Sequence, residues 1–222
     1  GVQTCALPIS LRASEDSTVG ILSGIGTLTL ERSQNGSTPT FTSSTTVNDI
    51  SVATFLTKLA VLFVKTVGLG TMGAPYIIHD ISQLQNISSM GAYYRLANNI
   101  NGSDFNFDPI GSSASQFIGS FDGNGKTISN LTINRSGTEY IGLFVSVGSV
   151  GVIDDVRLTT VSISGGQYTG GVTGFNEGSI SNSYVTGSVS GGYHTGGLVG
   201  RNDGTIEDSY STASVTGGYF TG

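Results

Sequence analysis

The sequence predicts an all-β fold, a parallel β-helix with coils of about 26 residues. One glycine-rich phrase recurs at that spacing, as GGQYTGGVTGFNEG at 165–178, GGYHTGGLVGRNDG at 191–204 and GGYFTG at 217–222. The composition agrees, because the chain has 34 glycines and only 11% charged residues, where soluble domains average about 25%. Glycine also interrupts every candidate helix, so the apolar residues form short β-like runs between Gly and Asn turns.

The repeats define the organisation of the second half of the chain, 127–222. The units span 127–148, which is degenerate, then 152–178, 179–204 and 205–222. A unit of this length is too short for helical-hairpin repeats of about 33 residues or more. We therefore expect each unit to form one coil of two or three strands, paired in register with the next coil about 4.8 Å away. A lone coil cannot bury its apolar face, so its stability comes from its neighbours.

A lead-in over 68–126 precedes the repeats. It begins with a turn and a strand over 68–80, and continues with a short helix predicted over 80–90. Asp80 is the expected N-cap of this helix and Gln83 its N3 residue.

The rest of the lead-in predicts strands. YYRLANNI, at 93–100, reads as one strand, and 117–133 reads as two strands around the DGNG turn at 122–125. Such a turn needs backbone at positive φ, which Asn and Gly accept.

The N-terminal part differs. Residues 10–67 read as a β-rich segment without repeats, in which 49–64 suits either a helix or strands. Residues 1–9, GVQTCALPI, resemble the in-frame translation of a sequencing adapter, so we expect an artefact that includes the only cysteine, Cys5. The alternative is a natural N-terminus. The chain ends at Gly222 partway through a coil, so we expect the natural protein to continue.

Charge and hydropathy restrict the function. The net charge of −6 argues against a nucleic-acid surface, which needs a basic stripe. The most apolar stretch, 52–64, is shorter than the roughly 18 residues of a membrane span and contains Lys58, so we expect no membrane insertion. A weakly acidic, secreted protein fits this balance.

The segment GGLVGRNDGTIEDSYSTASVTG, at 196–217, resembles the GLUG repeat of bacterial surface proteins. The lead-in from GAPYIIHD to IGLF, at 73–144, resembles the region before such repeats. Proteins of this kind include filamentous-haemagglutinin-like adhesins and the repeat regions of IgA-cleaving metallopeptidases. The resemblance covers about 70–222 and departs at GGVTGFN, 170–176. It implies a right-handed β-helix on an exported protein and implies no ligand.

Metal and catalytic chemistry find little support. The two histidines, His79 and His194, belong to no H-E-x-x-H motif, so loop or surface positions are expected and no metal site is predicted. A polysaccharide lyase would also need a basic residue beside bound calcium. Arg157 and Arg201 are candidates that nothing singles out.

Carboxylates are the remaining catalytic candidates. Glycoside hydrolysis needs two carboxyl groups about 5–10 Å apart. Stacked coils would bring Asp154 or Asp155 toward Asp208, but Asn182 holds the position between them. Asp122 lies in an FDGNG motif that also occurs in polysaccharide-degrading β-helices. We predict no catalytic residue.

The NEG and NDG turns are expected to be structural. Their asparagines can form a hydrogen-bonded ladder, and glycine supplies a left-handed conformation. Calcium binding by Glu177 and Asp203 is the alternative, although calcium wants six to eight oxygens. The turn residues are Asn176, Gly178, Asn202 and Gly204.

The residues that vary between GG and TG are the candidate binding surface. Stacked coils would align them into a column, and exposed aromatic rings can contact sugars or a partner protein. The alternative is that one member of each pair packs inward or against the neighbouring turn. The pairs are Gln167–Tyr168, Tyr193–His194 and Tyr219–Phe220.

The sequence therefore predicts a non-catalytic adhesive or spacer region of a secreted bacterial surface protein, extracellular or at the cell surface. We expect no cofactor, and as partner a host or community surface glycan or protein. One alternative is the repeat region of a surface metallopeptidase whose catalytic domain lies outside this chain. The other is a carbohydrate-active β-helix enzyme.

Overall fold

The structure is a computed structural model that describes residues 9–12, 28–31, 40–43 and 68–222. The chain divides into two compact units, Gly1–Phe63 and Val64–Gly222.

In the first unit the described residues form a three-stranded sheet. Strand β1 (Ile9–Arg12) pairs in parallel with β2 (Leu28–Glu31), and β2 pairs antiparallel with β3 (Thr40–Ser43). The proposed adapter residues, apart from Ile9, and the ambiguous stretch 49–64 lie outside the described residues.

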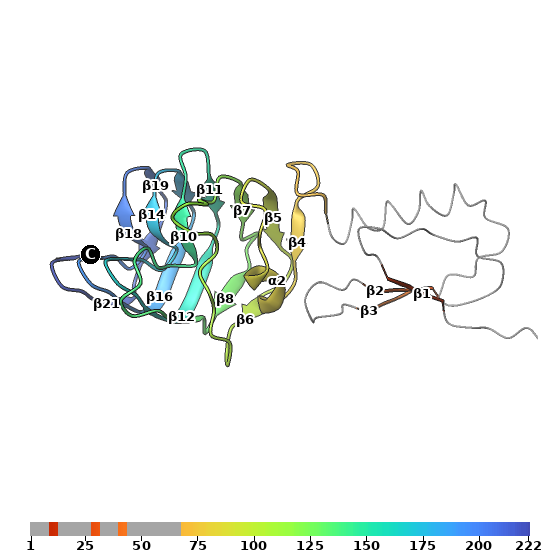
Figure 1. Cartoon of the computed structure of the whole chain (residues 1–222), viewed down its shortest axis with the longest axis horizontal. Coiled ribbons are helices and arrows are strands. Elements are labelled where there is room, and N and C mark those ends of the chain that lie inside the picture. Colours follow the sequence, from red (N-terminus) through yellow and green to blue (C-terminus); the bar gives the residue numbers. More distant parts are fainter. Residues whose placement is uncertain (1–8, 13–27, 32–39, 44–67) are drawn as a thin grey trace, which may run out of the picture. The chain divides into compact units, whose positions relative to one another are not determined.

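The second unit is a parallel β-solenoid, and the predicted fold class is confirmed (Figure 1). Each complete coil runs through four stacked sheets in turn. Sheet 1 holds β4 (Tyr76–Ile78), β5 (Tyr93–Leu96), β7 (Ser120–Asp122), β11 (Val152–Asp154), β15 (Ser179–Ser181) and β19 (Thr205–Glu207). Sheet 2 holds β6 (Ile100–Asn101), β8 (Thr127–Ser129), β9 (Thr132–Asn134), β12 (Arg157–Ser164), β16 (Tyr184–Ser190), β20 (Tyr210–Ser211) and β21 (Ser214–Thr216). Sheet 3 holds β13 (Tyr168–Thr169), β17 (His194–Thr195) and β22 (Phe220–Thr221), and sheet 4 holds β10 (Phe144–Val147), β14 (Thr173–Asn176) and β18 (Val199–Asn202).

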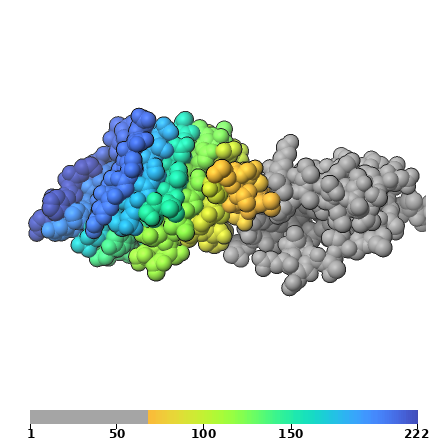
Figure 2. All heavy atoms as spheres, turned by 90° about the horizontal axis from the view of Figure 1, so that it is seen from above, coloured from red at the N-terminus to blue at the C-terminus, as the bar shows by residue number. Residues whose placement is uncertain are grey.

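The coils stack in register. In sheet 1, Ile153 pairs with Ile180 and Ile180 with Ile206, and all neighbouring strands of the solenoid sheets run parallel. The backbone amide of Ser183 donates to the hydroxyl of Ser209, 26 residues along the chain, at 3.0 Å. The space-filling view shows the consequence, because sequence colours form successive bands along the solenoid (Figure 2). The 26-residue period of the sequence thus corresponds to one coil of the solenoid.

The helix of the lead-in is shorter than expected. Helix α2 spans Ile81–Gln85 rather than 80–90. Its N-cap is as predicted, since the Asp80 side chain accepts from the Gln83 amide at 2.8 Å. It ends at Asn86 because the chain then turns to bury Ile87 in the core and to enter β5.

The strands of the lead-in also differ from the prediction. The stretch 117–133, predicted as two strands, holds β7, β8 and the start of β9. The run 93–100 is two strands, β5 and the start of β6, separated by a corner of the coil. At DGNG, Asn124 and Gly125 have the expected positive φ, 50° and 70°. The flanking strands β7 and β8 pair with neighbouring coils and not with each other, because the turn is a coil corner.

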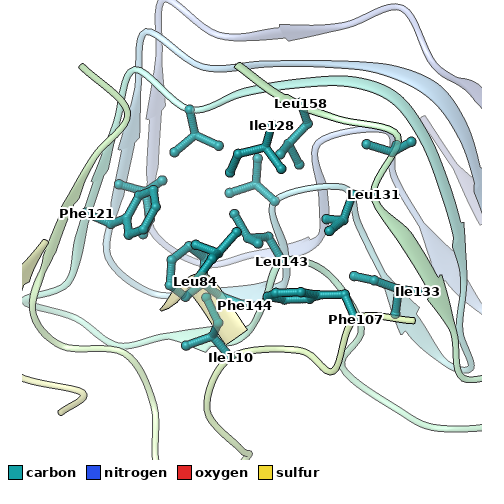
Figure 3. Close-up of a cluster of buried hydrophobic side chains, with 14 of the residues drawn as sticks. Leu84, Phe107, Ile110, Phe121, Ile128, Leu131, Ile133, Leu143, Phe144 and Leu158 are labelled. Carbon is teal, nitrogen blue, oxygen red and sulfur yellow. The ribbon is translucent and has the colours of Figure 1, made fainter. Parts of the chain in front are cut away.

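Inward-facing apolar side chains fill the interior of the solenoid. Figure 3 shows the labelled members of this cluster pointing into the space that the coils enclose. Leu84 of α2 is fully buried among them, so the helix contributes directly to the core. The largest fully buried side chains are Phe107, Phe117, Phe121 and Phe144.

Candidate functional site

Four rings from successive coils stack face to face along sheet 3, and we call them the ring ladder. They are Tyr140, Tyr168, His194 and Phe220. Neighbouring ring centroids lie 4.8, 5.0 and 4.9 Å apart, with interplanar angles of 13°, 5° and 8°. This distance matches the spacing of paired strands, so the coil register places each ring on the next. The faces of Tyr168 and His194 are therefore covered, and only their ring edges are available to a ligand.

Two tyrosines beside the ladder are oriented differently, and we call them the tyrosine platform. Tyr193 and Tyr219 have ring centroids 4.7 Å apart and an interplanar angle of 37°. Tyr193 is turned by 62° from the plane of His194. The two tyrosines are 42% and 77% exposed. Tyr219 lies against Tyr193 at a tilt and leaves 42% of Tyr193 exposed, so the platform offers aromatic surface that the sandwiched rings of the ladder do not.

Strand alternation explains which side chain is buried. In β13 and β17 the residue after the ring is a threonine, and successive side chains of a strand point to opposite faces. Thr169 and Thr195 are buried, whereas Tyr168 and His194 are only partly buried. Threonine thus takes the inward position, and both members of each variable pair keep contact with solvent.

Tyr140 belongs to the ladder although sequence reasoning missed it. Ile141 forms an isolated bridge with Thr169, which places Tyr140 level with Tyr168. The signal was present, because EYIGLF at 139–144 matches QYTGGV at 167–172 once the degenerate unit is aligned.

A cation lies beside the ladder. The guanidinium carbon of Arg201 is 5.1 Å from the Phe175 ring centroid, a cation–π distance. Arg201 Nη2 donates to Asp203 Oδ2 at 2.7 Å. This hydrogen bond, with the attraction of the Asp203 charge, raises the pKa of Arg201 above its ordinary value. Arg201 is therefore a paired cation on an exposed surface.

The asparagines of the NEG and NDG turns form hydrogen bonds between coils. Asn176 Nδ2 donates to Asn202 Oδ1 at 2.7 Å, and Asn176 Oδ1 accepts from the Gly178 amide at 3.2 Å. Asn202 Nδ2 in turn donates to the Gly204 carbonyl at 3.0 Å. Asn176 is fully buried, so these bonds satisfy its amide inside the protein.

The prediction that the glycines of these turns have a left-handed conformation was wrong. Neither Gly178 nor Gly204 has a positive φ. Glycine is needed there because a Cβ on Gly204 would lie 2.2 Å from the Gly178 carbonyl oxygen. The left-handed positions are at the corner between sheets 1 and 2, where Asp155, Asn182 and Asp208 have φ of 52°, 50° and 47°. Short polar side chains tolerate this conformation best after glycine.

The candidate carboxylates form hydrogen bonds and an ion pair at that corner. Asp155 Oδ1 pairs with Arg157 Nε at 2.7 Å, and its Oδ2 accepts from the Gly125 amide. Asp154 Oδ1 accepts from Ser181 at 2.7 Å and from Asn182 at 2.8 Å. Within residues 9–12, 28–31, 40–43 and 68–222, no group of three or more His, Cys, Asp or Glu could hold a metal ion.

A groove of about 400 Å³ on sheet 1 was not anticipated from the sequence. Tyr93, Ile118 and Val152 contribute to its lining, as does the ion pair of Arg95 Nε with Asp122 Oδ2 at 2.7 Å. Most of its lining comes from the lead-in, where the strict repeat that guided sequence reasoning is absent, and Val152 comes from the first strand of the unit 152–178.

The repeat can now be compared with known families. A family model described as the GLUG motif matches residues 165–190 and 191–216. This chain carries GLUG repeats. Each GLUG motif begins at the glycine pair before sheet 3, so the motif contains one ladder ring, one turn asparagine and the strands of sheets 4, 1 and 2. We call residues 165–216 the GLUG coils.

Two curated relatives are similar to the chain. Halomucin of Haloquadratum walsbyi is 34% identical over 160 residues, which cover 66% of this chain and 2% of halomucin. A protein of Evansella cellulosilytica, described as a Gly-rich membrane protein, is 32% identical over 130 residues, covering 53% of this chain and 15% of that protein. The chain thus spans only a small part of the length of either relative.

A crystal structure described as an immunoglobulin A1 protease from Bacteroides ovatus matches with a TM-score of 0.37 and 20% identity. The match covers 68% of this chain and 69% of that one. Within the described part of the chain, no helix is both long and apolar enough to cross a membrane.

Proposed function

We propose that the chain is a non-catalytic, adhesive repeat region of a cell-surface protein. The observation that carries the proposal is the in-register stacking of the GLUG coils, which places equivalent side chains of successive coils in rows. Contacts made by one row to one partner surface act at high effective concentration, so weak individual contacts add up to firm attachment.

The relatives support the location. One carries the name halomucin and another is described as a membrane protein, and both names fit a protein at the cell surface. The acidic, lysine-poor composition of the repeats fits exposure to solvent outside the cell.

The charged groups support a binding role over catalysis. Asp154, Asp155 and Arg157 hydrogen-bond to neighbouring coils or to each other at the corner of the solenoid. Asn182 occupies the equivalent corner position between Asp155 and Asp208, so no carboxyl of the next coil faces Asp155 there. Asp122 and Asp154 are register partners on neighbouring strands of sheet 1, but both carboxylates already have partners, Asp122 in an ion pair with Arg95 and Asp154 in hydrogen bonds from Ser181 and Asn182.

The test attaches the whole chain to beads at increasing surface density and measures bead retention under flow on layers of bacterial or epithelial cells. We expect retention to rise more steeply than linearly with density, because attachment through many weak contacts is cooperative. Beads that carry the heat-unfolded chain are the control. Retention no greater than this control, or release of cleavage products from the layer, would contradict the proposal.

A further inference from the structure

The tyrosine platform carries an inference about the ligand. The ring ladder itself is a poor sugar-binding surface, since Tyr168 and His194 are sandwiched at 4.8–5.0 Å and their faces are covered. Tyr193 lies in a coil that is followed by another coil and is still 42% exposed, and its ring is turned by 62° from the plane of His194. The edge contacts of Tyr193 with His194 and Phe220, at 5.0 and 5.6 Å, hold its ring in this orientation.

The platform continues into a polar position. The His194 amide donates to the Gln167 carbonyl at 2.7 Å, and the Phe220 amide donates to the Tyr193 carbonyl at 2.9 Å. These equivalent bonds show that Gln167, Tyr193 and Tyr219 occupy the same place in three successive coils. The carboxamide of Gln167, with its two N–H donors and one carbonyl acceptor, therefore belongs to the same row as the phenol rings of Tyr193 and Tyr219.

We infer that this row binds a neutral glycan chain that lies along the solenoid axis. The apolar C–H face of a pyranose ring packs on aromatic surface, and a few placed polar groups such as Gln167 select among hydroxyls. The coils repeat about every 4.8 Å along the solenoid axis, so a glycan chain that lies along this axis would pass each member of the row in turn. The inference rests on the adhesive function proposed above and names the ligand of that function.

Charge favours a neutral glycan over an acidic one. Arg201 is the only Lys or Arg between residues 165 and 222, and it is paired with Asp203. The same segment contains four carboxylates, Glu177, Asp203, Glu207 and Asp208. A polyanion would meet net repulsion here, whereas a neutral chain would not.

A protein partner is less well supported. A stable protein interface buries about 800 Å² on each side around an apolar centre. The residues that precede the platform in each coil are small or polar: Ser190, Gly191, Gly192, Thr216, Gly217 and Gly218. On its other side the platform borders the ring ladder, whose Phe220 is 59% exposed. The aromatic surface is therefore a strip bounded on one side by small or polar residues, which fits a thin polymer.

The test uses the whole chain and a panel of soluble polysaccharides, namely neutral β-glucan, mannan and galactan, and anionic hyaluronate and polygalacturonate. Affinity electrophoresis identifies binding, and calorimetry measures Kd. We expect a neutral glycan to bind. The double variant Tyr193→Ala/Tyr219→Ala should raise its Kd about tenfold. Tyr193→Phe/Tyr219→Phe should stay within about twofold, because stacking is retained.

The matched control is Tyr184→Ala/Tyr210→Ala. These tyrosines also stack across coils, at 5.4 Å and 12°, but on sheet 2. Circular dichroism must show that each variant keeps the wild-type fold. Equal loss in the control, stronger binding to the anionic glycans, or no binding to any neutral glycan would overturn the inference. If no neutral glycan binds but beads that carry the chain still adhere to cells, the adhesive function proposed above stands. Only the glycan is then rejected as its ligand.

Discussion

The coils before residue 148 and the GLUG coils fill their interiors in different ways. In the earlier coils, bulky rings meet each other, with Phe117 4.8 Å and Phe121 5.4 Å from Phe144 between ring centroids. In the GLUG coils the buried side chains are smaller and include polar groups: Thr169, Thr173, Asn176, Ser183 and Thr195. Side-chain amides and hydroxyls form hydrogen bonds between the GLUG coils. Close approaches of glycine to the backbone of a neighbouring coil occur in both regions, for example at Gly119 and Gly204.

This difference teaches what each part of the solenoid requires of its sequence. Aromatic side chains contribute stability through the apolar area they bury, and that contribution does not depend on a strict coil length. Rows of side-chain hydrogen bonds between equivalent residues hold only if every coil has the same path. The regular 26-residue period is therefore a property of the GLUG coils, and the irregular coils before them stay stable with larger side chains.

The largest effect is expected in the aromatic interior. Phe144→Ala should lower the free energy of unfolding by about 3–5 kcal/mol, because a fully buried ring is replaced by a cavity. In the GLUG coils, Ile180→Val removes one buried methyl group and should cost about 0.5–1.5 kcal/mol. Urea unfolding measures both, and a smaller loss for Phe144→Ala would mean that the rings do not dominate.

Alkaline pH should weaken the same aromatic interior. Burial raises the pKa of Tyr94 from 10.0 to about 12, and its hydroxyl donates to the Ser89 carbonyl at 3.0 Å. The folded state therefore favours the neutral phenol. Its contribution to stability is fully present below pH 10 and is lost as pH rises from 10 toward 12.

The variant Tyr94→Phe isolates this contribution, because it retains the ring without the titrating group. Urea midpoints at pH 8 and pH 11.5 should fall more in the wild type than in the variant. Equal falls would show that the alkaline sensitivity comes from other groups.

The GLUG coils should be sensitive to an added methyl group at their close glycine contacts. A Cβ on Gly174 would lie 2.4 Å from the Cα of Tyr140 in the preceding coil, and backbone cannot move aside as a flexible side chain can. Gly174→Ala should cost about 1–3 kcal/mol. Gly73→Ala is the control, because an added Cβ there meets nothing within 4 Å and should change stability by less than about 0.5 kcal/mol. Similar thermal midpoints for the two variants would contradict close coil packing as the role of Gly174.

The same division explains what sequence could predict. In the GLUG coils the period places Asn176 against Asn202 and Tyr168 against His194, so stacking follows from counting residues. In the lead-in, no period indicates that 93–100 breaks at a corner or that the helix ends at Gln85. Those boundaries depend on which apolar residues reach the shared interior, a tertiary condition that local pattern does not contain.

The orientation of the rings also could not be predicted from the sequence. Counting puts Tyr193 and His194 in adjacent columns but does not say that one is sandwiched and the other turned outward. The role of the turn glycines was misassigned for a related reason. Gly204 is required by contact with the Gly178 carbonyl in the preceding coil, and sequence alone showed only a turn.

The smallest effect is expected at Thr169 and Thr195, two threonines in equivalent positions of successive coils. Thr169 Oγ1 donates to the Gly166 carbonyl at 3.1 Å, whereas the buried Thr195 Oγ1 has no hydrogen-bond partner in the part of the chain that the structure describes. Thr169→Val should therefore cost about 1 kcal/mol, and Thr195→Val should be neutral or stabilise by up to about 1 kcal/mol, since it removes an unsatisfied buried hydroxyl. Thermal unfolding of the two variants makes the comparison within one column of one sheet. Equal destabilisation would show that Thr195 does form a bond, and that the two GLUG coils are more alike in their hydrogen bonding than their side-chain contacts indicate.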